Sequence, residues 1–189
     1  MPASKQSGFS SYSLENAALG LLMSDSKHGY GLYQEFAKTF ERIWKAGQAN
    51  FYAALTRLEA AGQLQSTAEP QEGRPARKIY EITEEGRDAF LHWIHTPVSS
   101  LRAIRVELLA KLRFFYILQL PGALELIDEQ IALLRHMIGE WERPVEAQDN
   151  VDQDAFHELV DDYRKRQAVF IANWLTDWRE HFQKDERTE

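Results

Sequence analysis

The chain has 189 residues, and 22 basic against 29 acidic side chains give a formal net charge of −7 with histidine neutral. It contains no cysteine, which excludes disulfide frameworks, thiolate nucleophiles and cysteine-ligated metal clusters. A hydrophobic share of 44% can bury a core, which argues against a disordered chain. The first residues lack the apolar stretch of a signal peptide, and no run approaches ~18 apolar residues. These features predict a folded, cytoplasmic protein.

The charge is unevenly distributed along the sequence. Residues 1–96 carry 10 basic and 11 acidic side chains, whereas residues 97–189 carry 12 basic and 18 acidic ones. The second half alone would repel nucleic acid. Within the nearly neutral first half, however, the segment 73–78 holds three cations, so a local basic feature is present in an acidic protein.

The hydrophobic pattern of the first half predicts four helices and two strands. The expected helices cover about 14–23, with Ser13 as N-cap, 29 to about 40, 48–61, and 84 to about 93, with Thr83 as N-cap. Two short strands at 64–68 and 78–82, joined by a long turn over 69–76, precede the last of these helices. This order is that of a winged helix-turn-helix with a two-stranded wing, in a mainly α protein.

The second half predicts a helical domain that forms a homodimer. Helices are expected over 101–120 and 123–141 and, after a polar break, in a last helix that carries apolar residues seven apart. The residues expected at a dimer interface are Phe156, Val160, Tyr163, Gln167, Phe170, Trp174 and Trp178. A monomeric bundle in which the last helix packs on residues 101–143 is the alternative. The expected organisation is a flexible arm (1–12), a winged-helix domain (13–96) and a helical dimerisation domain (97–189).

Four motifs occur in an order that resembles the PadR-like transcriptional regulators, specifically the longer members with a C-terminal helical domain of the virulence-activator type. They are Leu19-Gly20-Leu21-Leu22 with His28-Gly29-Tyr30-Gly31-Leu32, Phe51-Tyr52-Ala53-Ala54-Leu55-Thr56-Arg57-Leu58-Glu59, Gly73-Arg74-Pro75-Ala76-Arg77-Lys78-Ile79-Tyr80 and Ile82-Thr83-Glu84-Glu85-Gly86. The sequence departs from the family at Gly47, where Ser or Thr is usual, and at Thr56, where Lys is frequent.

The resemblance implies sequence-specific DNA binding by the helix at 48–61, with a pseudo-palindromic operator for a dimer. At its start Gln48, Ala49 and Asn50 would face base edges, since Gln and Asn can pair bidentately with adenine. The remaining expected contacts are to phosphates or the minor groove, from Lys45, Tyr52, Arg57, Arg74, Arg77 and Lys78.

The resemblance further implies repression and release by an aromatic or phenolic effector. The aromatic residues proposed for an effector site are Trp93, Phe114, Tyr116 and Trp174. An activator without effector and a winged-helix module that binds a protein remain as alternatives. No catalytic motif or cofactor site is recognised, so the protein is not expected to be an enzyme. The polar helix face formed by Glu85, Asp88, His92 and His95 is interpreted as solvated and not as a metal site.

Overall fold

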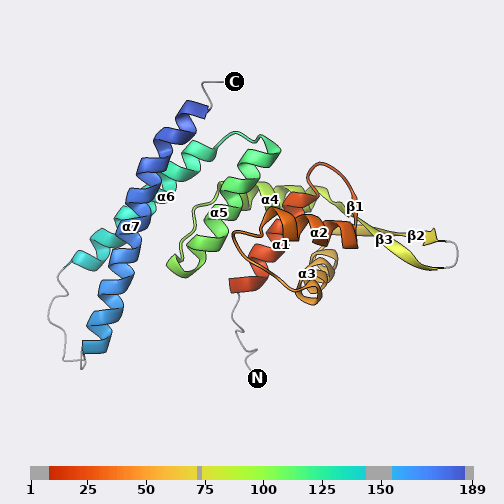
Figure 1. Cartoon of the computed structure of the whole chain (residues 1–189), viewed down its shortest axis with the longest axis horizontal. Helices are drawn as coiled ribbons and strands as arrows, with labels where there is room; N and C mark the ends of the chain where they lie inside the picture. The colour runs from red at the N-terminus through yellow and green to blue at the C-terminus, as the bar shows by residue number, and fades with distance from the viewer. Residues whose placement is uncertain (1–8, 72–73, 144–154, 186–189) are drawn as a thin grey trace. The chain divides into compact units, whose positions relative to one another are not determined.

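The computed structural model describes residues 9–71, 74–143 and 155–185. Its elements confirm the predicted mainly helical fold with a small antiparallel sheet (Figure 1). In chain order the elements are α1 (Phe9–Leu21), β1 (Lys27–His28), α2 (Gly29–Thr39), α3 (Gln48–Ala60), β2 (Leu64–Gln71), β3 (Arg74–Ile82), α4 (Glu84–His95), α5 (Leu101–Leu118), α6 (Ala123–Glu142) and α7 (Ala155–Asp185). They form two compact units, of which the first comprises residues 1–96 and 105–121 and the second 97–104 and 122–189.

Helix α1 is the centre of the first unit, because it packs against α2, α3 and α4. Its inner residues, among them Leu14, Ala17 and Ala18, are fully or almost fully buried. Gly20 allows a close approach, since a Cβ atom at this position would lie 2.5 Å from the Phe114 ring and 2.6 Å from the Phe90 ring. The small residue Gly20 thus allows the Phe90 and Phe114 rings to pack directly against the backbone of α1.

An aromatic cluster forms the core of this unit. Its buried members are Phe36, Phe40, Phe51, Phe90 and Phe114. The ring centroids of Phe36 and Phe51 are 5.0 Å apart, and those of Phe40 and Phe114 are 5.3 Å apart. Offset and edge contacts at such separations add to the free energy gained by apolar burial. Phe114 comes from α5, so residues beyond the expected boundary at 96 complete the winged-helix core.

The sheet has the strand order β1-β3-β2, with both pairs antiparallel. The short strand β1 was not predicted, because two residues are too few for an alternating pattern. The predicted long turn over 69–76 is wrong for most of its length, since β2 extends to Gln71 and β3 begins at Arg74. A register irregularity between Glu69 and Gln71 accommodates Pro70 at the point where the sequence suggested a turn.

The start of α1 also differs from the prediction. The helix begins at Phe9 and not after Ser13, so residues 9–12, assigned to the arm, belong to it. Ser10, Ser11 and Ser13 all lie within the helix, so the choice of Ser13 as N-cap placed its start too late. Residues 1–8 lie outside the described residues. The other predicted helices agree with the observed bounds to within a few residues.

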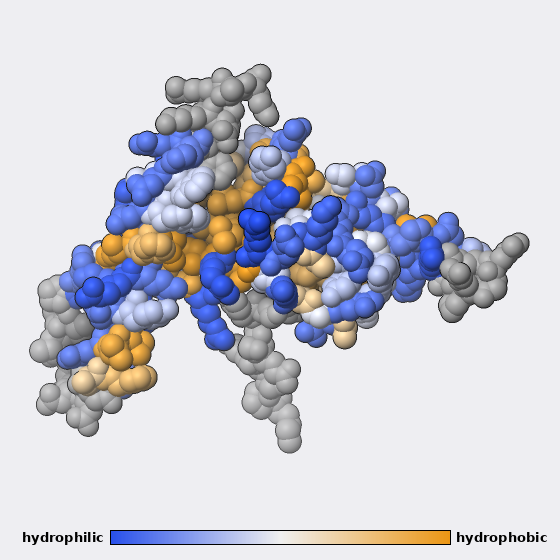
Figure 2. Space-filling view, in the orientation of Figure 1, coloured by the Kyte–Doolittle hydropathy of each residue, from blue (hydrophilic) through white to orange (hydrophobic). Residues whose placement is uncertain are grey.

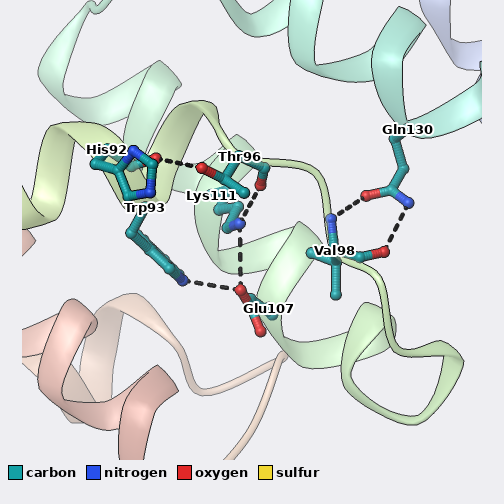
Figure 3. Close-up of polar contacts among 7 residues, drawn as sticks. All are labelled: His92, Trp93, Thr96, Val98, Glu107, Lys111 and Gln130. Carbon is teal, nitrogen blue, oxygen red and sulfur yellow. Dashed lines mark hydrogen bonds and ion pairs between the residues drawn. The ribbon is translucent and has the colours of Figure 1, made fainter. Parts of the chain in front are cut away.

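The second unit is built on α6 and α7, which lie side by side and run in opposite directions (Figure 1). Apolar residues of both helices are buried, among them Ile127 and Leu134 on α6 and Leu175 on α7. The buried Gln130 side chain forms two hydrogen bonds with the backbone of Val98. Its Oε1 accepts from the Val98 N–H (2.7 Å), and its Nε2 donates to the Val98 carbonyl (3.0 Å; Figure 3). Both polar ends of a fully buried side chain are therefore satisfied.

Candidate nucleic-acid interface

The start of α3 presents three exposed residues on a firmly held helix. Gly47 is the N-cap, with extended backbone (φ −68°, ψ 151°) and without a side-chain cap. The next turn is anchored by Phe51, which is buried against Phe36 and Tyr33. Gln48, Ala49 and Asn50 precede this anchor, and all three are exposed. The structure therefore brings the three predicted base-reading residues together at the free end of α3.

The turn before α3 is also fixed. The Tyr33 hydroxyl donates to the Ala46 carbonyl at 3.3 Å, which links α2 to this turn. Lys45 lies in the same turn and is exposed. Thr56 stands where the PadR-like regulators frequently have lysine. Its hydroxyl donates to the Tyr52 carbonyl one helical turn earlier (3.1 Å). This bond uses the Thr56 hydroxyl within the helix.

Two of the predicted phosphate-binding cations are paired with carboxylates. Arg57 donates its Nε–H to Glu15 of α1 at 2.5 Å. Lys78 lies 3.3 Å from both carboxylate oxygens of Glu59 on α3. The Ser66 hydroxyl, followed by Lys78, holds the pKa of the Glu59 carboxyl below its usual value, despite partial burial. Glu59 is therefore a carboxylate at neutral pH and offsets part of the Lys78 charge.

The wing hairpin supplies the remaining cations. Arg77 and Lys78 are exposed on β3, the strand between β1 and β2. Arg74 begins β3, and its side chain lies outside the described residues. In Figure 1 the hairpin extends from the base of the sheet, away from the helices of its own unit.

A groove of about 700 Å³ lies between the start of α2, Tyr52 of α3 and β3. Its lining residues are His28, Gly29, Tyr30, Gly31, Tyr52, Arg77, Lys78 and Tyr80. Gly29 lies at its base, and a Cβ atom there would lie 3.0 Å from both the Tyr52 and Tyr80 rings, so a larger residue would need these rings to shift. Burial, followed by Glu59 and Tyr52, raises the pKa of the Tyr80 phenol, which therefore stays neutral.

The aromatic residues proposed for an effector have different environments. Trp93 donates its indole N–H to Glu107 at 2.9 Å, and Lys111 lies 3.2 Å from Glu107 and 5.0 Å from the centroid of the Trp93 ring (Figure 3). Phe114 is a fully buried core residue, whereas Tyr116 is 73% exposed. Trp174 belongs to the second unit.

Lys111 is the most unusual charged residue of the first unit, because only 1% of its surface is exposed. Its ammonium donates to the carbonyl of Thr96 at the end of α4, in addition to its ion pair with Glu107 (Figure 3). Burial lowers the pKa of Lys111, and Glu107 opposes this shift. Sequence reasoning missed this residue, because a lysine in an amphipathic helix is ordinarily solvated.

The polar face of α4 does not gather a metal site. Within residues 9–71, 74–143 and 155–185, no group of three histidine or acidic side chains could hold a metal ion. His95 has its ring nitrogens 2.8 Å from the Leu91 carbonyl and 3.2 Å from the Pro121 carbonyl. No helix in the described part of the chain is both long and apolar enough to cross a membrane.

In the second unit, the predicted dimerisation residues are divided between two environments. Phe156, Tyr163 and Phe170, spaced by seven residues, are 64–68% exposed. Ala168, Ala172 and Leu175 are buried and lie on the opposite face of α7. Of the neighbouring residues, Val160 and Trp178 are exposed, and Gln167 and Trp174 are half-buried. Figure 2 shows the hydrophobic surface at the end where α7 begins.

Comparison with known proteins identifies the winged-helix region. Residues 18–92 match the family described as "Transcriptional regulator PadR-like family", a range that covers α2, α3, the sheet, the groove and most of α4. Residues 18–92 are similar to this family, and the match covers less than half of the chain. The match contains the α3 start and the wing but does not extend to α6 and α7.

Two curated proteins are similar to parts of this chain. The probable transcriptional regulator Rv1176c of Mycobacterium tuberculosis is 32% identical over 89 residues, 47% of each chain. The match thus spans about half the length of this relative. The negative transcriptional regulator PadR of Bacillus subtilis is 25% identical over 136 residues, which are 69% of this chain and 74% of that protein. Both are named as transcriptional regulators and not as enzymes.

Among solved structures, Bacillus subtilis PadR in complex with operator DNA matches with a TM-score of 0.43 at 21% identity. The match covers 87% of this chain and 96% of that chain.

Proposed function

We propose that the protein is a sequence-specific DNA-binding transcriptional regulator that reads the major groove with the start of α3. The observation that carries this proposal is the exposed triplet Gln48-Ala49-Asn50 on a helix anchored one turn later by buried Phe51. A recognition helix needs this combination, because its reading side chains must be free while its axis is fixed by the core.

Base reading is assigned to Gln48 and Asn50. Their amides each offer a donor and an acceptor, which match the N6 and N7 groups of adenine in the major groove. Ala49 between them is small and apolar and suits contact with a thymine methyl group. The operator half-site is therefore expected to contain A·T pairs opposite the start of α3.

Phosphate contacts are assigned to Lys45, Tyr52 and the wing cations. Lys45 and Arg77 are exposed and stand on either side of α3 in the sequence. Arg74 is retained as a wing contact on its position in β3. Arg57 and Lys78 have carboxylate partners, so each must exchange a carboxylate for a phosphate when it binds DNA. We therefore expect them to contribute less affinity than their charges suggest.

A homodimer through α7 completes the proposal. The row of Phe156, Tyr163 and Phe170 lies on the face opposite to the buried residues of α7, and it is exposed in the single chain. Aromatic side chains in such a row are favourable at an interface, because each buries a large area in a few conformations. Two copies would present two α3 helices to successive major grooves of a pseudo-palindromic operator. Repression and release by an aromatic ligand are proposed on the family resemblance.

The proposal is tested by fluorescence anisotropy of the full chain with labelled DNA from its own upstream region and with unrelated DNA of equal length. Wild-type protein is expected to bind the upstream DNA more tightly, with log affinity falling linearly with log salt. Replacing Gln48 and Asn50 with Ala should reduce discrimination between the two DNAs by about 1–3 kcal/mol for each lost bidentate pair.

A matched control is the substitution of Gln34 and Gln65 with Ala, since both are exposed glutamines of the same unit, on α2 and β2, away from the α3 start. It should leave discrimination unchanged. Absence of binding to either DNA at low salt would contradict DNA binding and favour a protein-interaction module. Unchanged discrimination in the Gln48/Asn50 variant would contradict the assignment of base reading to α3.

A further inference from the structure

The first turn of α3 carries the proposed base-reading residues, but the helix itself does little to hold this turn. The N-cap Gly47 offers no side-chain acceptor, and the Phe51 N–H donates to the Gly47 carbonyl at 3.1 Å. The backbone N–H groups of residues 48–50 precede this bond and have no acceptor within the helix. A helix start without a cap unwinds more readily than a capped one.

The chain is fixed by aromatic packing before and after this turn. Before it, the Trp44 ring centroid lies 5.3 Å from that of Phe36 and 5.2 Å from that of Phe40. After it, Phe51 is fully buried. None of the six described residues between these anchors, 45–50, is buried. The reading triplet therefore lies in a stretch that the core does not hold directly.

Tyr33 of α2 contacts this stretch on both sides of Gly47. Its hydroxyl donates to the carbonyl of Ala46, the residue before the N-cap, at 3.3 Å. Its ring packs on Phe51, with centroids 5.7 Å apart and ring planes inclined by 59°. One side chain thus holds the backbone that enters α3 and the anchor that follows its first turn.

The Tyr33 hydroxyl matters to base reading for a geometric reason. A bidentate pair between a side-chain amide and adenine needs two hydrogen bonds of good geometry at once, so the backbone of residues 48–50 must be ordered in the complex. A turn that is already ordered in the free protein loses less conformational entropy when it binds. Contacts to phosphates carry no base identity and do not depend on this ordering in the same way.

We propose that Tyr33 is a positioning residue for base reading, which supports the start of α3 from α2 in place of an N-cap side chain. The inference rests on the proposed function and assigns no DNA contact to Tyr33. Its hydroxyl acts through the Ala46 carbonyl on the reading triplet. Tyr33 therefore contributes to the preference for the operator and not to the general attraction between the protein and DNA.

The test is the substitution Tyr33→Phe in the full chain, which removes the hydroxyl and keeps the ring beside Phe51. Thr96→Val is the matched control, because the Thr96 hydroxyl also donates to a backbone carbonyl, that of His92 on α4 (2.7 Å). Anisotropy with upstream and unrelated DNA at several salt concentrations gives affinity, discrimination and salt dependence. Amide hydrogen exchange of the free protein reports the opening of residues 48–50, and thermal unfolding verifies that both variants are folded.

Tyr33→Phe is expected to weaken binding to the upstream DNA by about 3- to 10-fold, which corresponds to one hydrogen bond, and to change binding to unrelated DNA by about twofold at most. The slope of log affinity against log salt should stay the same, because no phosphate contact is lost. Amide exchange at residues 48–50 should become faster. Thr96→Val should alter neither discrimination nor this exchange, whatever its effect on stability.

A second arm restores the cap. Gly47 has the extended backbone that suits an N-cap serine, and nothing lies within 4 Å of a Cβ placed there. In Gly47→Ser the hydroxyl can accept from the Asn50 N–H, so adding this change to Tyr33→Phe should recover discrimination and slow the exchange.

Unchanged discrimination in Tyr33→Phe, an equal loss for both DNAs, or no recovery with Gly47→Ser would overturn the role of Tyr33. Unchanged exchange in Tyr33→Phe would overturn its support of the α3 start without reference to DNA. If the wild-type protein did not distinguish the two DNAs, the proposed function would fail, and the reading role of Tyr33 with it.

Discussion

At the scale of single residues, the interface is shaped by carboxylates as much as by cations. Glu59 holds Lys78, and Glu15 holds Arg57, across contacts between different elements. The sequence could predict that these cations stand near α3, because the motif spacing places them there. It could not predict their partners, since Glu59 and Lys78 are 19 residues apart and Glu15 and Arg57 are 42 apart. Pairs of this kind exist only once the fold has brought the elements together.

The Glu59→Gln variant is expected to bind DNA more tightly. The amide still accepts a hydrogen bond from Ser66 but no longer neutralises Lys78, so the released ammonium becomes available to a phosphate. We expect affinity to rise by about 3- to 10-fold at low salt, with a steeper salt dependence. Anisotropy titrations against upstream DNA measure both quantities.

Glu81→Gln is the matched control, because Glu81 is an exposed residue of the same hairpin that accepts from the neutral Gln65 side chain. It changes the net charge equally without releasing a cation. An equal gain in both variants would mean that only net charge matters and that the Glu59–Lys78 pair has no specific effect.

At the scale of elements, the start of α4 is tied to the end of α3. Gly62 leaves α3 with a positive φ of 72°, which glycine adopts without strain. Thr83 then joins the two segments: its hydroxyl donates to the Gly62 carbonyl (2.7 Å) and accepts from the Gly86 N–H (3.1 Å). These bonds connect the end of α3 to the start of α4, and they hold the wing at both of its ends.

Gly86→Ala is expected to destabilise the first unit by about 2–3 kcal/mol, because it overpacks a rigid contact. The added Cβ would lie 2.1 Å from the backbone carbonyl oxygen of Gln63, which cannot rotate away. Gly31→Ala is the same chemical change at an open helical position and should raise stability by about 0.5–1 kcal/mol. Urea unfolding followed by circular dichroism compares the two variants. Similar effects of both would contradict a packing requirement at Gly86.

The sequence predicted the helices well and the sheet less well, for a physical reason. Helix bounds follow from an apolar period that continues over several turns, as in α2 and α3, and from caps such as Thr83 at the start of α4. The wing strands pair only with each other toward their tip, so polar residues and prolines are tolerated where β2 and β3 continue. The groove was not predicted, because it forms from three elements that are distant in the sequence.

At the scale of the whole molecule, the proposed dimer connects α7 with DNA binding. Phe170 provides a cleaner probe of this role than Trp174, since Phe170 is 68% exposed while Trp174 is half-buried within its own chain. Two half-sites bound by one dimer give an affinity that a single winged-helix domain does not reach, because the second contact is made at high local concentration.

Phe170→Asp is expected to convert the dimer into a monomer and to weaken binding to the upstream DNA by about 100-fold or more. Size-exclusion chromatography with light scattering measures the mass, and anisotropy measures the affinity. Thr176→Asp is the control, as it adds the same charge to an exposed position on another side of α7. A dimeric Phe170→Asp variant would refute the role of this face, and a monomeric variant with unchanged affinity would refute the link to DNA binding.

The continuity of α5 determines where the DNA-binding head can be separated from the rest of the chain. Residues 105–121 belong to the first unit, and Phe114 fills the space that Gly20 leaves on α1. A gene fragment that stops at codon 96 would therefore encode a first unit that lacks Phe114 and has a cavity in its core. It would nevertheless include every residue of the family match. A transplantable head, for instance one fused to a different dimerisation module in a synthetic regulator, has to retain the chain through Pro121.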